Sequence, residues 1–387
     1  MLGAERITVC PLRMGRRRGW CESRFLTHFI DGDGLVALST GAIGANRRDA
    51  LARGLSETIE RQAVFPANRR AARENEITAT FAENWRSFLP DQLHSSAYRP
   101  WDGATVLPTL RTVDLIDGKI SSVPAQIVYF SIKGERRHYP PSDTTGLSAH
   151  DDLGKAIVTG ALELIEKTSI VASWRAKLPP RKLDIGTLDG LNDGLIAADA
   201  RQLTVRLFDV SLIDEIAVCF ALVQSPRDDF HYAVGASASL NTSKAAIKAL
   251  NEAMQSYDSH RQYFFDPDIS VATAGGHAGA CLRAAGRDGF ERHYGYLDRP
   301  CQIARIHTQA DGLETLRETM SKHVTELHVF SFPTARNARL RTVRVISPEL
   351  LWSLPALNGD VPAARRGLPT AVKEAFCDSC PEPMPFP

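Results

Sequence analysis

The chain has 387 residues, of which 43% are hydrophobic and 24% are charged, and its formal net charge is +1. This length and composition are typical of a globular protein with one large domain or two ordinary ones. A net charge this close to zero gives no general attraction to nucleic acid or to an anionic membrane. The basic run at residues 16–18 is expected to be a solvated loop rather than a binding patch.

The sequence contains no recognisable membrane or targeting segment. No stretch approaches the roughly 18 consecutive apolar residues that a membrane helix requires, and no apolar segment follows the first basic residues. The seven cysteines are an odd number scattered along the chain, which argues against a disulfide framework. Cys377 and Cys380 have CxxC spacing, but a zinc site needs two further ligands, so reduced thiols are favoured over zinc. We therefore expect a cytoplasmic protein that contacts neither membrane nor nucleic acid.

Helical and strand-like segments interleave along the chain. Hydrophobic periodicity predicts long amphipathic helices at residues 47–65, 153–174 and 243–264. Runs rich in branched apolar residues predict strands at 125–130, 204–210, 216–223 and 342–346. This order predicts an α+β fold in which helices cover mixed β-sheets.

The last residues differ in composition from the rest. No repeat or long linker is visible, so we predict one domain over residues 1–362. A proline-rich tail follows at residues 363–387, where the prolines exclude a helix because each removes a hydrogen-bond donor.

Acidic residues recur at the same spacing on the predicted helices. The first helix carries Glu57 and Glu60, followed by Arg61. The second carries Glu163 and Glu166, three residues apart. Residues at this spacing project from the same helical face, so each helix presents two carboxylates side by side.

The remaining charged and polar residues of the second and third helices have a similar spacing. Lys167 comes directly after the second pair, as a cation does in the first helix. The third helix carries Glu252 and Gln255 at the same spacing, with Lys248 one turn earlier. Carboxylates on an apolar background need a compensating cation, and magnesium held by a few carboxylates and substrate phosphates is one solution. A solvated face with intrahelical salt bridges, such as Glu57 with an arginine one turn later, is the alternative, and spacing alone leaves both open.

The segments that carry these acids resemble the three motifs of the YcaO family. Residues 39–61 (STGAIGANRRDALARGLSETIER) resemble the first motif, which ends in E-x-x-E-R. Residues 142–174 resemble the second, a Gly-bearing turn before an acidic helix and a tryptophan. Residues 234–257 resemble the third, and 343–350 (VRVISPEL) resemble the strand and proline that follow. The resemblance implies a YcaO-type α+β fold with an ATP and Mg²⁺ site between the three acid-bearing helices.

Within the family, the chain is similar to the cyclodehydratase subunits of microcin-type azole peptide synthetases. These proteins share the YP-x-x-DT-x-G turn at residues 139–146 and a PxPxP terminus, here Pro383, Pro385 and Pro387. The resemblance implies that these prolines are catalytic, with the terminal carboxylate moving protons near the ring. Deletion of the last five residues is then expected to abolish cyclisation and to spare nucleotide binding.

The resemblance also assigns the acidic and basic residues of the three helices. It implies that magnesium ions are held by Glu57, Glu60, Glu163 and Glu166. It implies that the nucleotide site is lined by these four residues and by Arg61, Thr144, Lys167, Lys248, Glu252 and Gln255. Two of these positions depart from the family, because Lys167 and Lys248 stand where arginine is common. Lysine keeps the charge but lacks the bidentate fork of arginine.

The activity implied is ATP-dependent cyclodehydration of Cys, Ser or Thr in a ribosomally made precursor peptide, which yields thiazolines or oxazolines. The chain has no GxxxxGK[ST] sequence, which argues against a P-loop ATPase. The partners implied are the precursor peptide with its leader, a leader-binding subunit and an FMN-dependent azoline dehydrogenase. Thioamide or amidine formation by the same nucleotide chemistry, or a silent scaffold that binds the precursor, are the alternative functions.

Overall fold

The chain is divided into two compact units. The computed structural model describes residues 8–17, 20–31, 34–44, 46–64, 109–129, 143–226, 230–264, 284–299, 302–333, 339–350 and 384. Unit 1 comprises residues 1–164, 312–354 and 362–364, and unit 2 comprises residues 165–311, 355–361 and 365–387. The boundary falls inside one long helix, α5, at Leu153–Ala176.

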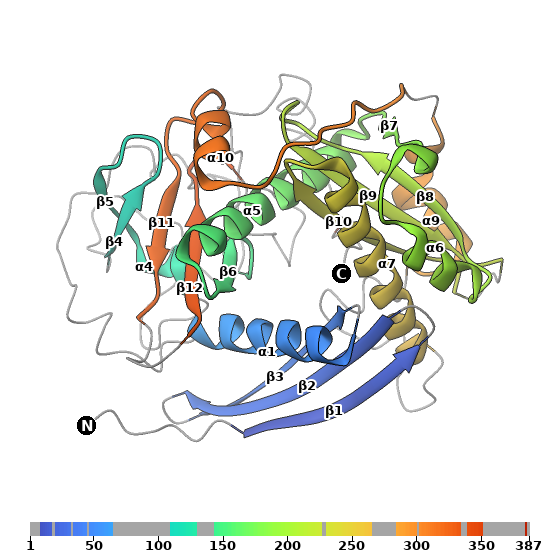
Figure 1. Ribbon diagram of the computed structural model, residues 1–387, viewed down its shortest axis with the longest axis horizontal. Helices are drawn as coiled ribbons and strands as arrows, with labels where there is room; N and C mark the ends of the chain where they lie inside the picture. Colours follow the sequence, from blue (N-terminus) through green and yellow to red (C-terminus); the bar gives the residue numbers. More distant parts are fainter. Residues whose placement is uncertain are drawn as a thin grey trace. The chain divides into compact units, whose positions relative to one another are not determined.

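Unit 1 begins with an antiparallel meander covered by a helix (Figure 1). Its strands are β1 (Thr8–Arg17), β2 (Trp20–Asp31) and β3 (Gly34–Gly44). The helix α1 (Arg47–Ala63) packs on β2 and β3. It starts where it does because the side chain of Asn46 accepts a hydrogen bond from the Asp49 backbone N–H at 3.0 Å. The buried hydroxyl of Thr58 lies 2.6 Å from that of Thr40 and ties the helix to β3.

A second, five-stranded sheet completes unit 1, in the order β5-β4-β11-β12-β6. Its strands are β4 (Thr109–Asp114), β5 (Ile120–Pro124), β6 (Leu147–His150), β11 (His328–Ser331) and β12 (Arg341–Ile346). Two helices belong to this part of the chain: α4 (Ala125–Val128) and α10 (Leu313–Met320). Val343, Val345 and Ile346 of β12 are fully buried, so β12 belongs to the core of the unit.

Unit 2 contains a four-stranded sheet in the order β10-β9-β8-β7. Its strands are β7 (Arg181–Lys182), β8 (Thr204–Asp209), β9 (Ala217–Gln224) and β10 (Tyr232–Ser239). Its helices are α6 (Asn192–Asp199), α7 (Thr242–Phe264) and α9 (Arg287–Tyr294). Every residue of β10 is buried, and α7 packs along β10 and β9 (Figure 1).

Gly235 sets how closely α7 approaches β10. A Cβ atom at this position would lie 2.3 Å from the backbone nitrogen of Ala253 and 2.5 Å from the carbonyl oxygen of Ala249. Since real Cβ contacts are never this short, only glycine permits the observed packing. The approach brings the middle of α7, with its acidic residue, against the strand backbone.

The sequence predicted the main elements correctly. The three long helices are α1, α5 and α7, and the predicted strands at 204–210, 216–223 and 342–346 are β8, β9 and β12. The α+β class is confirmed. The strand predicted at 125–130 is wrong, because residues 125–128 form α4 and are buried on every side. A short, mostly apolar run in which every described position is buried carries no periodicity that separates a buried helix from a buried strand.

One detail of the predicted sheets also differs. All pairings between the named strands are antiparallel, and the parallel pairing among the described residues is an isolated bridge between Lys182 and Ile303. Only a few residues separate β1 from β2, β4 from β5 and β9 from β10, and connections this short require neighbouring strands to run in opposite directions. Among the described helices, none has the length and apolar character needed to cross a membrane.

Candidate nucleotide and metal site

The acids of α1 lie in unit 1 beside one arginine. The Arg61 Nη2 atom lies 2.5 Å from the Glu57 Oε1 atom, so the intrahelical salt bridge that the sequence allowed is present. The Glu57 side chain is 27% exposed and that of Arg61 is 35% exposed. The ion pair therefore neutralises one carboxylate of the pair and leaves the second to be balanced by other groups.

Glu60 is that second carboxylate. Burial, and then repulsion from Glu57, raise the pKa of Glu60 from its ordinary value of 4.5 to about 8, while Arg61 and the backbone N–H of Ala149 lower it. The side chain keeps partial solvent access. With a pKa near 8 in the absence of a bound cation, Glu60 favours its protonated form at neutral pH, and a cation bound beside it would favour the charged form.

The first half of α5 is seated against the turn that precedes β6. A Cβ atom at Gly160 would lie 2.6 Å from the carbonyl oxygen of Gly146, and that same oxygen accepts a hydrogen bond from the Val345 backbone N–H at 2.7 Å. Gly146 has a φ of +76°, which favours glycine. Half-buried Glu163 follows Gly160 by three residues, so both lie on one helical face.

The turn itself is held by its own polar groups. The backbone N–H of Thr145 donates to the Asp143 Oδ1 atom at 2.8 Å, and the carbonyl oxygen of Thr144 accepts from the Leu147 N–H at 2.9 Å. Thr144, a predicted nucleotide-site residue, is therefore a turn residue directly before β6. The Asx-type bond from Asp143 to the backbone two residues later stabilises the turn locally.

In unit 2, Glu166 is buried beside Lys167. The Lys167 Nζ atom lies 3.4 Å from the Glu166 Oε1 atom. Burial raises the pKa of Glu166 to about 7; Lys167 lowers it, Glu252 raises it, and Lys248 lowers it. Unit 2 thus brings together four of the residues that the sequence predicted.

Glu252 is anchored on the sheet. Its Oε2 atom accepts a hydrogen bond from the Ala236 backbone N–H of β10 at 3.1 Å. Burial raises the pKa of Glu252, whereas Lys167, the Ala236 N–H and Lys248 lower it. Lys248 is exposed on α7, and Gln255 is half-buried one turn after Glu252. The hydrogen bond from Ala236 and the close approach of α7 to β10 at Gly235 explain how the Glu252 carboxylate is held against the sheet.

The donor chemistry fits magnesium and phosphate. In the described part of the chain, no three His, Cys, Asp or Glu side chains gather into a metal cluster. Mg²⁺ is commonly held by one or two carboxylates, with water and substrate phosphates completing its shell. Paired carboxylates with raised pKa values are suited to such an ion, because a divalent cation would supply the charge that the neighbouring Lys and Arg do not.

Some functional candidates lie elsewhere. Pro383, Pro385 and Pro387, and the tail around them, lie outside the described residues apart from Met384. Arg344 and Asp143 were not predicted as site residues. In unit 1, Arg344 interacts electrostatically with both Asp143 and Glu163. The signal for Arg344 was present in the sequence, because a charged residue interrupts the apolar run of β12.

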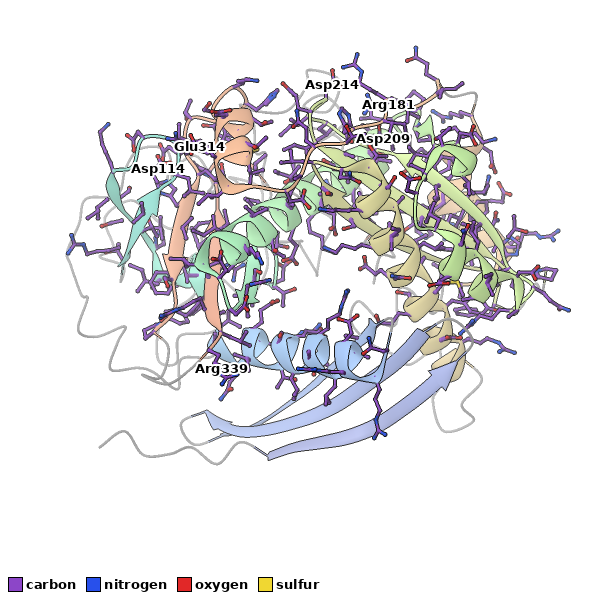
Figure 2. The ribbon with its side chains drawn as sticks, in the orientation of Figure 1. Asp114, Arg181, Asp209, Asp214, Glu314 and Arg339 are labelled. Carbon is purple, nitrogen blue, oxygen red and sulfur yellow. The ribbon has the colours of Figure 1, made fainter. Side chains whose placement is uncertain are left out.

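A further charge cluster in unit 2 is structural. Figure 2 shows Arg181 beside Asp209 and Asp214. The Arg181 Nε atom lies 3.0 Å from Asp209 and its Nη1 atom lies 3.3 Å from Asp214, while Nη2 donates to the Ser211 carbonyl oxygen at 3.1 Å. Each partner lies at or just after the end of β8, so this arginine fastens the short strand β7 to its neighbour.

These features agree with a known family. The model of the YcaO cyclodehydratase family, described as ATP- and Mg²⁺-binding, matches residues 41–351. The match covers well over half of the chain, which therefore belongs to the YcaO family. ATP and Mg²⁺ are the cofactors of this family.

Individual relatives are more distant. The chain is 24% identical over 157 residues to the microcin B17-processing protein McbD of Escherichia coli, a match that covers 38% of this chain and 40% of McbD. The match thus spans about two fifths of the curated relative's length. A chain of the E. coli microcin synthetase McbBCD complex aligns with a TM-score of 0.70 and 17% identity, covering 98% of this chain and 96% of that chain.

A third relative was solved with its nucleotide. YcaO from Methanopyrus kandleri, bound with AMPPCP and Mg²⁺, aligns with a TM-score of 0.60 and 18% identity, covering 90% of this chain and 86% of that chain. At these identities the two structural likenesses establish the fold, which is shared over almost the whole chain.

Proposed function

We propose that this chain is the ATP- and Mg²⁺-dependent cyclodehydratase subunit of an azole-modified peptide synthetase. It converts Cys, Ser or Thr residues of a ribosomally made precursor peptide to thiazolines or oxazolines. The observation that carries the proposal is the set of buried carboxyl groups with raised pKa values on the helices that match the family motifs. Burial raises the pKa of Glu60 to about 8 and that of Glu166 to about 7, and it also raises the pKa of Glu252.

The proposed roles follow the motif positions. The metal-binding residues are Glu57, Glu60, Glu163 and Glu166. The nucleotide-binding residues are these four with Arg61, Thr144, Lys167, Lys248, Glu252 and Gln255. Bound Mg²⁺ would neutralise charge on the nucleotide phosphates and on the transferring phosphoryl group. The side chains bind and orient the nucleotide, and the lysines and arginine add fixed positive charge.

The proposed reaction begins on the substrate peptide. The side-chain sulfur or oxygen of Cys, Ser or Thr attacks the preceding backbone carbonyl carbon and loses its proton, which leaves a five-membered ring bearing an oxyanion. That oxygen takes the γ-phosphoryl group of ATP, and ADP leaves. Loss of the amide proton and of phosphate then forms the C=N bond of the azoline. The enzyme acts by positioning the two substrates and by stabilising phosphoryl charge.

The partners of this reaction are also proposed. The likeness to a chain of the McbBCD complex, whose structure covers nearly all of this chain, supports work inside a heteromeric synthetase. The proposed partners are the precursor peptide with its leader, a leader-binding subunit and an FMN-dependent azoline dehydrogenase. The subunit alone is then expected to be weak or inactive.

Mass spectrometry tests the proposal. A candidate precursor peptide is incubated with this chain, its partner subunits, ATP and Mg²⁺, with the dehydrogenase left out. We expect stepwise loss of single water masses that depends on ATP. Glu163→Gln should abolish this loss, because an amide lacks the negative charge that a carboxylate ligand supplies to Mg²⁺. Glu314→Gln, an exposed carboxylate of the same unit that is paired with Arg317, is the matched control and should remain active.

Other outcomes would contradict the proposal. A peptide that is bound but left unchanged, with all partners present, would support a scaffold. A mass change equal to sulfur replacing oxygen, seen only with a sulfide source, would support thioamide formation. Equal activity of wild type and Glu163→Gln would exclude the proposed metal residues while leaving the reaction intact.

A further inference from the structure

A fully buried arginine lies in the core of unit 1. Arg344, in the middle of β12, is 0% exposed. Its strand position is opposite Leu147 of β6 on one side and Phe330 of β11 on the other. The Nη1 atom donates to the Val128 carbonyl oxygen, the last residue of α4, at 3.0 Å. Arginine in such a place is expensive to bury unless its charge is compensated.

The compensation comes from two acids of the same unit. The negative charges of Asp143 and Glu163 favour the charged form of Arg344, which burial disfavours. Asp143 belongs to the turn before β6, and Glu163 belongs to α5. The guanidinium therefore interacts with a residue of the proposed metal site and with the turn that precedes it, although it does not reach solvent.

The backbone next to Arg344 holds the same two elements. The N–H of Val345 donates to the Gly146 carbonyl oxygen at 2.7 Å, and a Cβ at Gly160 would lie 2.6 Å from that oxygen. The turn is thus bonded to β12 on one side and packed against α5 on the other. In β12, Val345 fixes the backbone of the turn. The preceding residue, Arg344, supplies positive charge to Asp143 of the turn and to Glu163.

We propose that Arg344 is a positioning residue, which holds the Asp143 turn and the Glu163 carboxylate in the arrangement that Mg²⁺ and nucleotide require. The inference rests on the proposed function, because it takes Glu163 as a metal residue. Mg²⁺ demands nearly ideal octahedral geometry, and partners behind the direct ligands orient them. Complete burial keeps Arg344 from contact with the substrate, so it acts through Glu163.

The test measures Mg²⁺ dependence of nucleotide binding without turnover. Full-length protein is titrated calorimetrically with AMPPCP at increasing Mg²⁺, and the Mg²⁺ concentration for half-maximal binding is compared between variants. Arg344→Met should raise this concentration roughly 10–100-fold, the usual effect of losing a residue that orients a metal ligand. Arg344→Lys keeps the charge but not the fork, so it should recover part of the loss.

The matched control is His328→Leu. His328 is 1% exposed, lies on the neighbouring strand β11, and its Nε2 and Nδ1 atoms lie 2.7 Å from Glu326 and 3.3 Å from Thr112. Its loss should lower thermal stability and leave the Mg²⁺ requirement within about twofold, the behaviour of a merely structural residue. A shift in Arg344→Met no larger than that of the control would overturn the inference.

Two further comparisons keep the outcome decisive. If Arg344→Met does not fold, a folded Arg344→Lys protein with an unchanged Mg²⁺ requirement contradicts the inference, and a several-fold increase supports it. The Glu163→Gln variant distinguishes a failure of the proposed metal site from a failure of the proposed role of Arg344. An unchanged requirement in Glu163→Gln removes the metal residue and the inference together. A raised requirement in Glu163→Gln, with none in the Arg344 variants, removes the inference alone.

Discussion

Replacing Glu60 by glutamine should make the nucleotide-free protein more stable at pH 8 and little changed at pH 5. In the folded protein, burial and repulsion from Glu57 raise the pKa of Glu60 to about 8 from an ordinary value of 4.5. The folded state therefore binds a proton between these pH values, whereas the unfolded chain releases it. Glutamine does not titrate, so the variant removes this difference in proton binding between the folded and unfolded states.

The sign and size follow from proton linkage. Because the folded state binds more protons than the unfolded state, the free energy of unfolding falls as pH rises from about 4.5 to about 8. The slope for one group is about 1.4 kcal/mol per pH unit inside the window. Partial solvent access of Glu60 reduces the effect, so a gain on the order of 2 kcal/mol at pH 8 is expected for Glu60→Gln.

Urea unfolding at pH 5, 6, 7 and 8 measures this effect in the absence of nucleotide and Mg²⁺. Glu314→Gln is the control, because the Glu314 carboxylate is exposed and Arg317 holds its pKa below the ordinary value. The difference between wild type and Glu60→Gln should grow with pH, while the control should show no such growth. A difference that is constant across the range, or a variant less stable than wild type at pH 8, would refute the reasoning.

Two more predictions concern unit 2. Gly235→Ala should lower the free energy of unfolding by about 1–3 kcal/mol through overpacking of α7 on β10, and it should weaken AMPPCP binding. Urea unfolding measures the first effect and calorimetry the second. Gly312→Ala is the control, because a methyl group fits at that position. Lys167→Met should raise the pKa of Glu166 above about 7, because Lys167 lowers it. The pH midpoint of Mg²⁺-dependent AMPPCP binding should then move upward, and an unchanged midpoint would contradict a role for Glu166 in that site.

The pattern of residues along the sequence was sufficient to predict the helices that carry the candidate site. Glu57 and Glu60, and likewise Glu163 and Glu166, share a helical face because three residues make nearly one turn, a property of the backbone that holds in any tertiary context. The order of motifs predicted the YcaO family, and the match over residues 41–351 confirms it. Strands with β-branched residues, such as β12, were also found from local composition.

Local sequence pattern did not predict the structure of the segment at 125–130. Residues 125–128 are all buried, so no alternation of buried and exposed positions distinguished the helix α4 from a strand. The meander of β1 to β3 was not predicted either, although it supports α1. Sheets form from residues far apart in sequence, and their pairing depends on packing that a local pattern does not contain.

By itself, the sequence determined which residue types lie three apart on three helices, since helical geometry is local. The tertiary structure decided which of those acids are charged. The pKa values of Glu60 and Glu166 are raised first by burial and then by a neighbouring carboxylate, Glu57 for Glu60 and Glu252 for Glu166. Glu252 meets the Ala236 N–H because Gly235 lets α7 lie close to the sheet. The partner acids of Arg344 likewise come from other elements of unit 1. Burial and electrostatic fields are sums over neighbours in space, so only the folded chain could assign them.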